Sequence, residues 1–161
     1  NHYSGEYKWI LAPHEIGDSH IKAIMEKCQK KIARYTQAPT NLSEYDVLII
    51  DCIGLLSSVY RYGNISYIGG GFGVGIHNTL EAAVYGIPVI FGPKYHKFNE
   101  AVTLIKEGGG FSINNGTELK ELLDSLISNP TITQTAGEKA LAYVKSQLGA
   151  TSIILDELIH K

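Results

Sequence analysis

Hydrophobic residues along this chain follow two alternating patterns. Short continuous apolar runs are typical of strands that are covered on both faces of a sheet. They occupy residues 9–12, 46–51, 65–68 and 88–91, and a weaker one occupies residues 110–113. Apolar residues at helical spacing lie between these runs and after the last one. They predict helices within residues 21–32, 55–60, 78–85, 98–105, 119–127, 140–148 and 153–159.

This alternation of strands and helices predicts an α/β fold, with a parallel sheet and helices on both of its faces. Ligands of such folds bind beyond the carboxyl ends of the strands. Polar or glycine-rich segments follow the four stronger strands, at residues 13–17, 51–54, 69–81 and 92–99. We therefore expect a binding site to be built from these segments.

Composition narrows the class of protein. A length of 161 residues predicts a single domain over residues 1–161. The chain is 44% hydrophobic and 19% charged, which excludes disordered, collagen-like and coiled-coil proteins. A net charge of −2 offers no basic surface for nucleic acid or an anionic membrane. Cys28 and Cys52 favour free thiols in a reducing compartment, and no apolar run approaches the roughly 18 residues of a membrane span.

Glycine is concentrated in one part of the chain. Of the 17 glycines, 13 lie between Gly54 and Gly116, and five of these fall within residues 69–75, after a predicted strand and before a predicted helix. Glycine lets a backbone approach a ligand closely, and the free N–H groups of a helix N-terminus attract phosphate. The loop lacks the Lys-Ser/Thr pair of a P-loop, so we do not expect nucleoside triphosphate hydrolysis. The segment indicates an anion or nucleotide site.

The polar residues around this segment each have two interpretations. Asn78 and Glu81 have the spacing of a capping box, with Asn78 at the N-cap and Glu81 at N3. Alternatively, Glu81 faces the ligand and accepts hydrogen bonds from ribose hydroxyls. A hydrogen bond to a phosphate or a carbonyl explains His77 better than metal binding, because no third ligand is evident. His14 and Glu15 are either a solvated loop pair or a wall of the same cleft.

No catalytic group emerges from the sequence. A Ser-His-Asp order, a nucleophile elbow and a Cys-x-x-Cys pair are all absent. An enzyme built from the candidate residues alone would have positioning groups and an anion cradle, but no general base. We therefore predict no catalytic residue and no metal ligand within this chain.

Residues 69–101 resemble the C-terminal half of the 3-deoxy-D-manno-octulosonic acid (Kdo) transferases of lipopolysaccharide synthesis. The pattern of that family reads Gly-Gly-Ser/Gly-Phe, a short loop, His-Asn-x-x-Glu, and then Gly-x-Pro-Val-x-x-Gly-Pro. The matching positions are Gly69, Gly70, Gly71, Phe72, His77, Asn78, Glu81, Gly86, Pro88, Val89, Gly92 and Pro93. Residues 12–15 and 51–56, followed by Tyr60, match two further family segments more weakly. The order of these motifs over residues 9–113 is specific, whereas no single motif is.

The resemblance implies the C-terminal half of a GT-B glycosyltransferase, whose two Rossmann-like domains face each other across a cleft. This chain would be the donor-binding domain of an enzyme that transfers Kdo from CMP-Kdo to a lipid A precursor, without a metal or other cofactor. The general base and the acceptor site would belong to an N-terminal domain outside this fragment, which would itself be soluble and inactive alone. The full enzyme would work at the cytoplasmic side of the bacterial inner membrane. The implied donor contacts are His14, Glu15, Gly54, Gly70, Gly71, Phe72, Ile76, His77, Asn78 and Glu81.

The chain departs from the family pattern at three positions. Pro13 stands where many relatives carry Arg before the first-loop His, Leu55 replaces an acidic residue, and Ala82 replaces Pro. Without that Arg, the charge that faces the donor has to come from elsewhere, and Lys94 or Lys97 is the candidate.

Two other functions stay open at this stage. One is a UDP-sugar-binding GT-B transferase or epimerase domain, and the other is a non-catalytic nucleotide-binding module in which Asn78 and Glu81 only cap a helix. The chain starts at Asn1 and its only methionine is Met25, so we expect a natural N-terminal part to precede it.

Overall fold

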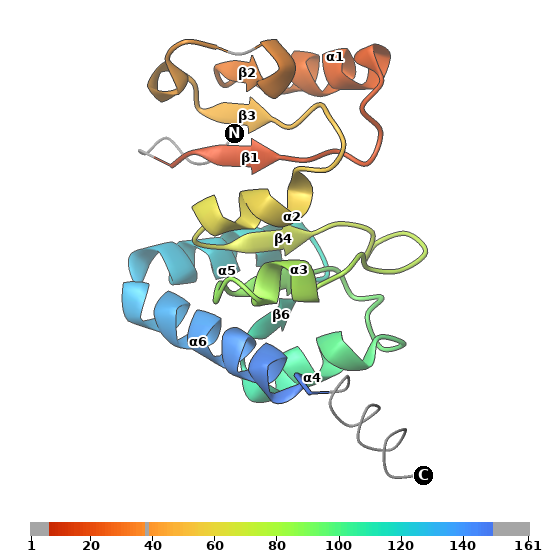
Figure 1. The fold of residues 1–161 in the computed structure, drawn as a ribbon, viewed down its shortest axis with the longest axis vertical. Coiled ribbons are helices and arrows are strands. Elements are labelled where there is room, and N and C mark those ends of the chain that lie inside the picture. Colours follow the sequence, from red (N-terminus) through yellow and green to blue (C-terminus); the bar gives the residue numbers. More distant parts are fainter. Residues whose placement is uncertain (1–6, 38, 150–161) are drawn as a thin grey trace. The chain divides into compact units, whose positions relative to one another are not determined.

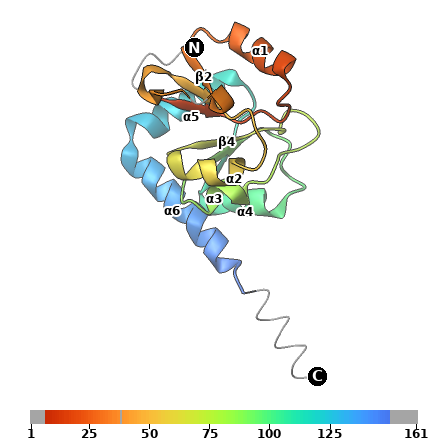
Figure 2. The ribbon, with the colours of Figure 1, turned by 45° about the horizontal axis from the view of Figure 1, so that its top comes forward.

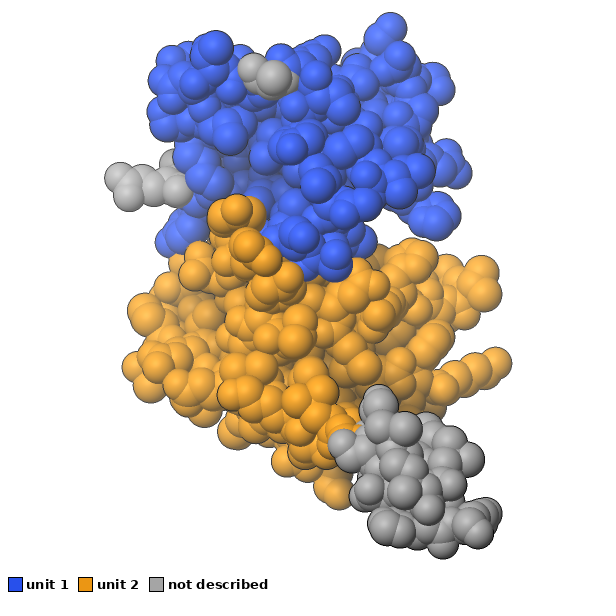
Figure 3. Space-filling view, in the orientation of Figure 1, with its two compact units in different colours: residues 1–59 blue, residues 60–161 orange. Residues whose placement is uncertain are grey.

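The computed structural model describes residues 7–37 and 39–149. The chain divides into two compact units, residues 1–59 and residues 60–161, which Figure 3 shows in different colours. Each unit has a parallel sheet of its own. The expected single domain over residues 1–161 stays a prediction.

Unit 1 is built on a three-stranded parallel sheet in the order β1-β3-β2 (Figure 1). Its strands and α-helices are β1 (Trp9–Leu11), α1 (Asp18–Lys27), β2 (Ile32–Arg34), β3 (Val47–Ile49) and α2 (Leu56–Val59). Short 3₁₀ turns occupy Tyr35–Gln37 and Leu42–Glu44. Ile21 of α1 packs against Val47 and Ile49, which are buried because β3 is the central strand.

Strand β2 differs from the sequence-based expectation. Ile32 fits the helical spacing set by Ile21 and Cys28, but α1 ends at Lys27 and Ile32 begins a strand. Cys28 already has extended backbone angles, with φ −98° and ψ 125°. Ile32 still packs on the same core, from the sheet rather than from a helix. Pairing with β3 therefore decides between two structures that the apolar spacing alone allows.

Unit 2 carries the second parallel sheet, in the order β4-β5-β6. Its elements are a 3₁₀ turn (Tyr60–Tyr62), β4 (Ser66–Ile68), α3 (Leu80–Ala83), β5 (Val89–Phe91), α4 (Asn99–Glu107), β6 (Gly110–Ser112), α5 (Gly116–Ser128) and α6 (Pro130–Ser146). Helix α6 runs past α3, α4 and α5 and contacts all three (Figures 1 and 2). Every residue of the central strand β5 is fully buried, which explains its uninterrupted apolar run. The predicted α/β class with parallel strands is confirmed.

Glycines allow the turn between α4 and β6 to pack closely against α6. Helix α4 ends at Glu107, its C-cap Gly108 has a left-handed φ of +82°, and the chain then turns at once into β6. A Cβ on Gly109 would lie 2.6 Å from the backbone nitrogen of Ala140. The turn therefore packs directly on α6, so these glycines have a structural role.

Three helix boundaries differ from those expected. Helix α3 covers only Leu80–Ala83, because the chain turns towards the strand at Gly86. Helix α5 begins at Gly116, before the expected residue 119, because the Asn115 side chain caps it by accepting a hydrogen bond from the Glu118 amide. Helix α6 has 17 residues and begins at Pro130, well before residue 140. The helix expected over residues 153–159 lies outside the described residues.

Candidate functional site

The loop that follows β4, residues 69–77, is folded back on itself, and we call it the glycine loop. Gly70 has a φ of +88°, and a Cβ there would overlap the carbonyl oxygen of Gly75. The Gly73 amide donates to the Gly70 carbonyl at 2.8 Å, and the His77 amide donates to the Gly69 carbonyl at 3.1 Å. Any side chain at residue 70 is therefore opposed both by the left-handed backbone and by lack of space.

The loop that follows β5, residues 92–97, touches the glycine loop along the backbone. Strands β4 and β5 are parallel neighbours, so their carboxyl ends lie at the same edge of the sheet. A Cβ on Gly71 would lie 2.6 Å from the Gly92 nitrogen, and one on Gly92 would lie 2.7 Å from the Gly71 carbonyl carbon. The Lys94 amide donates to the Gly71 carbonyl at 3.0 Å. This contact is possible only with glycine at both positions.

Lys94 also holds the tip of the glycine loop through its side chain. Its Nζ donates a hydrogen bond to the Gly73 carbonyl at 2.7 Å. Phe72 and Val74, on either side of Gly73, have exposed side chains. Among the described residues, the backbone amides of Phe72 and Val74 donate to no protein acceptor. The tip therefore presents N–H groups of the kind that bind anions.

A hydrogen bond joins the side chains of Asn78 and Glu81, but the two residues do not form the expected capping box. The N-cap of α3 is Thr79, one residue later than expected. The Asn78 Oδ1 accepts a hydrogen bond from the Leu80 amide at 3.0 Å, so Asn78 still caps the first turn. The Glu81 Oε1 accepts from the Asn78 side-chain amide at 3.1 Å, where a capping box would use the backbone N–H of the N-cap residue. Burial and, after it, the charge of Glu81 raise the pKa of Tyr60.

His77 and Ile76 point in opposite directions relative to the core. Ile76 is 5% exposed and belongs to the hydrophobic cluster of unit 2, so only its backbone is placed to meet a ligand. His77 is exposed, and a Cβ on Gly70 would lie 3.3 Å from the His77 Cδ2 atom. Its imidazole therefore lies directly over the start of the glycine loop.

The remaining predicted residues belong to unit 1. His14 and Glu15 are exposed in the loop between β1 and α1, and Glu15 lies 3.9 Å from the Nδ1 atom of His20. Gly54 has a φ of +92° in the loop after β3, and no described atom outside its chain neighbours lies within 4 Å of a Cβ placed there. Gly54 is therefore favoured by its backbone angle rather than by lack of space. Strands β1 and β3 are parallel neighbours, so these two loops share one edge of that sheet.

Sequence reasoning missed a polar cluster at the same edge of unit 1. The side chain of Asp51, directly beyond β3, is fully buried. It accepts hydrogen bonds from the Arg34 Nε at 2.7 Å, the Thr36 amide at 2.9 Å and the Thr36 hydroxyl at 2.6 Å. Arg34 also donates to Asp18 at 2.8 Å. The signal in the sequence was an acidic residue ending a buried apolar run, but its partner lies on β2, which the helical spacing concealed.

These hydrogen bonds set the charge of Asp51. Burial alone would raise the pKa of its carboxyl group, but the hydroxyl and amide of Thr36 and the guanidinium of Arg34 outweigh that effect. The pKa of Asp51 is lowered from 3.8 to about 2. Asp51 is therefore ionised at neutral pH, and it fixes the start of the loop that carries Gly54.

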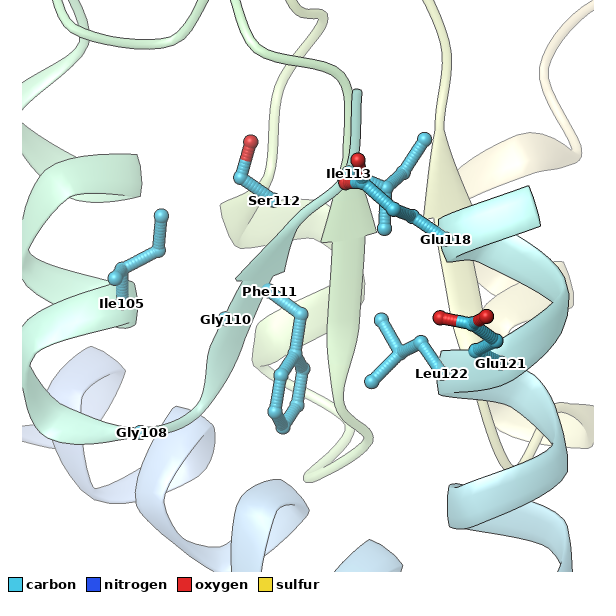
Figure 4. Close-up of a pocket in the computed structure, with 9 residues that line it drawn as sticks. All are labelled: Ile105, Gly108, Gly110, Phe111, Ser112, Ile113, Glu118, Glu121 and Leu122. Carbon is cyan, nitrogen blue, oxygen red and sulfur yellow. The ribbon is translucent and has the colours of Figure 1, made fainter. Parts of the chain in front are cut away.

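A separate open pocket lies beside the edge strand β6, with a volume of about 500 Å³ (Figure 4). Figure 4 shows the Phe111 ring beside Leu122 of α5, with Glu118 and Glu121 at the helix. The Glu118 carboxylate is already used, because it accepts hydrogen bonds from Asn114 and Asn115. None of the predicted donor contacts lines this pocket.

Two further searches covered residues 7–37 and 39–149. Within these ranges, no three His, Cys, Asp or Glu side chains converge in a way that could hold a metal ion. Over the same ranges, the structure contains no helix with the length and apolar character needed to cross a membrane.

Comparison with curated proteins shows that the chain belongs to the 3-deoxy-D-manno-octulosonic acid transferase family, as its motifs indicated. The chain is 41% identical over 123 residues to the 3-deoxy-D-manno-octulosonic acid transferase of Aquifex aeolicus, covering 75% of this chain and 34% of that protein. It is 32% identical over 158 residues to the transferase of the same name from Rickettsia typhi, covering 94% of this chain and 33% of that protein. The chain therefore spans about a third of the length of these relatives. No family model matches the chain.

Comparison with solved structures supports the fold. The C-terminal CMP-Kdo binding domain of WaaA from Acinetobacter baumannii matches with a TM-score of 0.74 at 22% identity, covering 86% of this chain and 73% of that one. The C-terminal domain of a group 1 glycosyl transferase from Francisella tularensis matches with a TM-score of 0.53 at 15% identity, covering 91% and 88%. The Rossmann-like α/β fold expected from the motifs is confirmed.

Proposed function

We propose that this chain is the donor-binding domain of a Kdo transferase and that it binds CMP-Kdo. The observation that carries this proposal is the backbone contact between Gly71 and Gly92, which fixes the glycine loop, His77 included. Asn78 and Glu81 follow this loop directly in the sequence. Glycine at residues 71 and 92 lets the two backbones meet directly, which fixes the glycine loop against the loop after β5. Relatives that match 75% and 94% of the chain bear the name of this transferase, which supports the same assignment.

The phosphate of the donor would bind at the tip of the glycine loop. Helix α3 has only four residues, so its dipole contributes little, and the amides of Phe72 and Val74 are the better donors. Gly70 and Gly71 contribute by allowing the loop its shape. His77, whose ring lies over the start of the loop, would donate a further hydrogen bond to the donor.

The ribose of the donor would bind at Glu81. One oxygen of this carboxylate accepts a hydrogen bond from Asn78, which orients the carboxylate and leaves the other oxygen for a ribose hydroxyl. Asn78 is in turn held by the Leu80 amide. On unit 1, His14, Glu15 and Gly54 remain predicted donor contacts, with Gly54 acting through its backbone.

The proposed reaction belongs to the full-length GT-B enzyme. The bond between the anomeric carbon of Kdo and the CMP phosphate breaks, and a bond from that carbon to a hydroxyl oxygen of the lipid A precursor forms. A base in the N-terminal domain takes the hydroxyl proton, and CMP departs as an anion that the loop amides stabilise. Acceptor binding, and with it the location at the cytoplasmic side of the inner membrane, is assigned to parts outside residues 1–161.

Isothermal titration calorimetry of the 161-residue chain with CMP, UDP, GDP and ADP tests this proposal. We expect CMP to bind at least tenfold more tightly than the other three nucleotides. A preference for UDP would instead identify a UDP-sugar-binding domain. If none of the four nucleotides binds, the remaining alternative is the non-catalytic module in which Asn78 and Glu81 only cap a helix.

The role of Glu81 is tested in the same assay. Glu81→Ala should raise the Kd of CMP about tenfold or more, because a charged hydrogen-bond acceptor to the ribose is lost. The matched control is Glu107→Ala, the same change at the exposed end of α4, which should leave the Kd within about twofold. Normal CMP binding by a folded Glu81→Ala variant would exclude the ribose contact.

A further inference from the structure

Asn115, at the start of α5, is the one asparagine in the sequence that is followed by glycine. The backbone nitrogen after an asparagine can attack the side-chain amide carbon, and glycine favours this attack because no Cβ crowds the nitrogen. Outside its own helix and chain neighbours, a Cβ on Gly116 would meet no described atom within 4 Å. Among the described residues, the Gly116 N–H donates to no protein acceptor, as is usual in the first turn of a helix. The attacking nitrogen is therefore neither crowded nor hydrogen-bonded.

The folded chain holds the Asn115 side chain away from this nitrogen. The Asn115 Oδ1 accepts a hydrogen bond from the Glu118 amide at 2.9 Å, and the Asn115 Nδ2 donates to the Glu118 Oε1 at 2.9 Å. The other Glu118 carboxylate oxygen accepts from the backbone and the side chain of Asn114, at 2.8 and 3.0 Å, which fixes the carboxylate. The backbone of Asn115 is extended, with φ −162° and ψ 176°. Ring closure requires ψ to rotate and both hydrogen bonds to Glu118 to break.

We propose that Asn115 is a site of spontaneous deamidation and that Glu118 keeps it unreactive while the first turn of α5 is folded. When this turn opens, the Gly116 nitrogen loses its proton and bonds to the Asn115 Cγ. The bond from Cγ to Nδ2 breaks, and the side-chain nitrogen leaves as ammonia with that proton. Water then opens the cyclic imide at either of its two carbonyls, which gives aspartate or isoaspartate. In total, one asparagine and one water become one aspartyl residue and one ammonia.

Both products change the start of α5. An aspartate at residue 115 still accepts from the Glu118 amide, but it has no N–H to donate to the Glu118 carboxylate and adds a second negative charge beside it. Isoaspartate lengthens the backbone by one carbon, so the geometry of the cap is lost. Because α5 packs against α6, the reaction weakens the start of a helix that supports unit 2.

The test compares deamidation in the folded and the unfolded chain. The wild-type chain, Glu118→Ala and the control Glu121→Ala are incubated at neutral pH in buffer and in unfolding urea, and each asparagine is followed by peptide mass spectrometry. In urea, Asn115 should react before every other asparagine, at the same rate in all three chains. In buffer, the wild-type rate should be about tenfold lower than in urea. Glu118→Ala should react about fivefold faster than wild type in buffer, and Glu121→Ala should stay within about twofold.

Each other result overturns a stated part of the inference. Earlier reaction of another asparagine in urea would show that Asn115 is not the site. Equal wild-type rates in buffer and in urea would show that the fold does not restrain Asn115, and equal rates of Glu118→Ala and wild type in buffer would exclude Glu118 as the restraint. A Gly116→Ala chain checks the chemistry, since its added Cβ should slow the reaction in urea, and an unchanged rate would exclude attack by this nitrogen. None of these outcomes depends on nucleotide binding.

Discussion

Replacing Gly71 with alanine probes the backbone contact that shapes the glycine loop. The added methyl group would lie 2.6, 2.7 and 2.9 Å from the N, Cα and C atoms of Gly92. Non-bonded carbon atoms prefer about 3.5–4.0 Å, so the two loops would have to separate by about 1 Å. Overpacking of this kind costs about 1–3 kcal/mol, and weakening the hydrogen bond between Lys94 and Gly71 adds about 1 kcal/mol. We expect the free energy of unfolding to fall by about 2–4 kcal/mol.

Gly73→Ala is the matched control for this experiment. Gly73 lies in the same loop, but a Cβ there would be 3.5 Å from its nearest neighbour, the Gly70 carbonyl oxygen, which is ordinary contact. Alanine should therefore be neutral or slightly stabilising at residue 73. Both variants are unfolded in urea and followed by circular dichroism, with CMP affinity measured in parallel. A Gly71→Ala variant as stable as Gly73→Ala would refute the close approach of the two loops.

The double variant Gly71→Ala/Gly92→Ala adds a second check on the same contact. A Cβ on Gly92 meets the Gly71 carbonyl carbon at 2.7 Å, so each substitution forces the same separation. Once the loops have parted for one methyl group, the second should cost less than it does alone. If the losses of unfolding free energy in the two single variants simply add up in the double variant, the two substitutions act on independent contacts.

Two other predictions concern buried polar groups. Asp51→Asn should lower the free energy of unfolding by about 3 kcal/mol at pH 7, because Arg34 loses its buried partner. The folded pKa of Asp51, about 2, lies below its usual value of 3.8, so this stabilisation is complete above about pH 4 and is lost as the pH falls towards 2. A difference in stability between the wild-type chain and Asp51→Asn that does not shrink over this window would contradict the assignment. Thr79→Val should stabilise the chain by about 1 kcal/mol in thermal unfolding, because among the described residues the buried Thr79 hydroxyl has no hydrogen-bond partner; a loss of stability would show that it has one.

The sequence predicts best those elements whose pattern of apolar residues fits only one type of secondary structure. The apolar runs that became β3 and β5 are continuous and too short for helices, so their assignment needed no tertiary information. Ile32 shows the opposite case, since its spacing from Cys28 suits a helix while its place beside β3 makes it a strand residue. The hydrogen bond between Asp51 and Arg34 could therefore not be predicted, because Arg34 lies on a strand that the apolar spacing does not reveal.

The candidate site was predictable in outline but not in its contacts. The glycines of residues 69–75 and the residues His77, Asn78 and Glu81 can be found along the chain because they are close in sequence. The contact between Gly71 and Gly92 depends on the parallel pairing of β4 with β5, which places two distant loops at one edge. The hydrogen bond from Lys94 to Gly73 follows from that contact, and no spacing rule contains it.

Nuclear magnetic resonance of the chain labelled with 15N-glycine is the most direct test of the donor site. Glycine amides report on both the glycine loop and remote parts of unit 2, so CMP is added while all of these signals are followed. We predict that the signals of Gly70, Gly71 and Gly73 shift with the CMP concentration, while those of Gly109 and Gly137 stay in place. Shifts confined to the remote glycines, or none at saturating CMP, would contradict a donor site at the glycine loop.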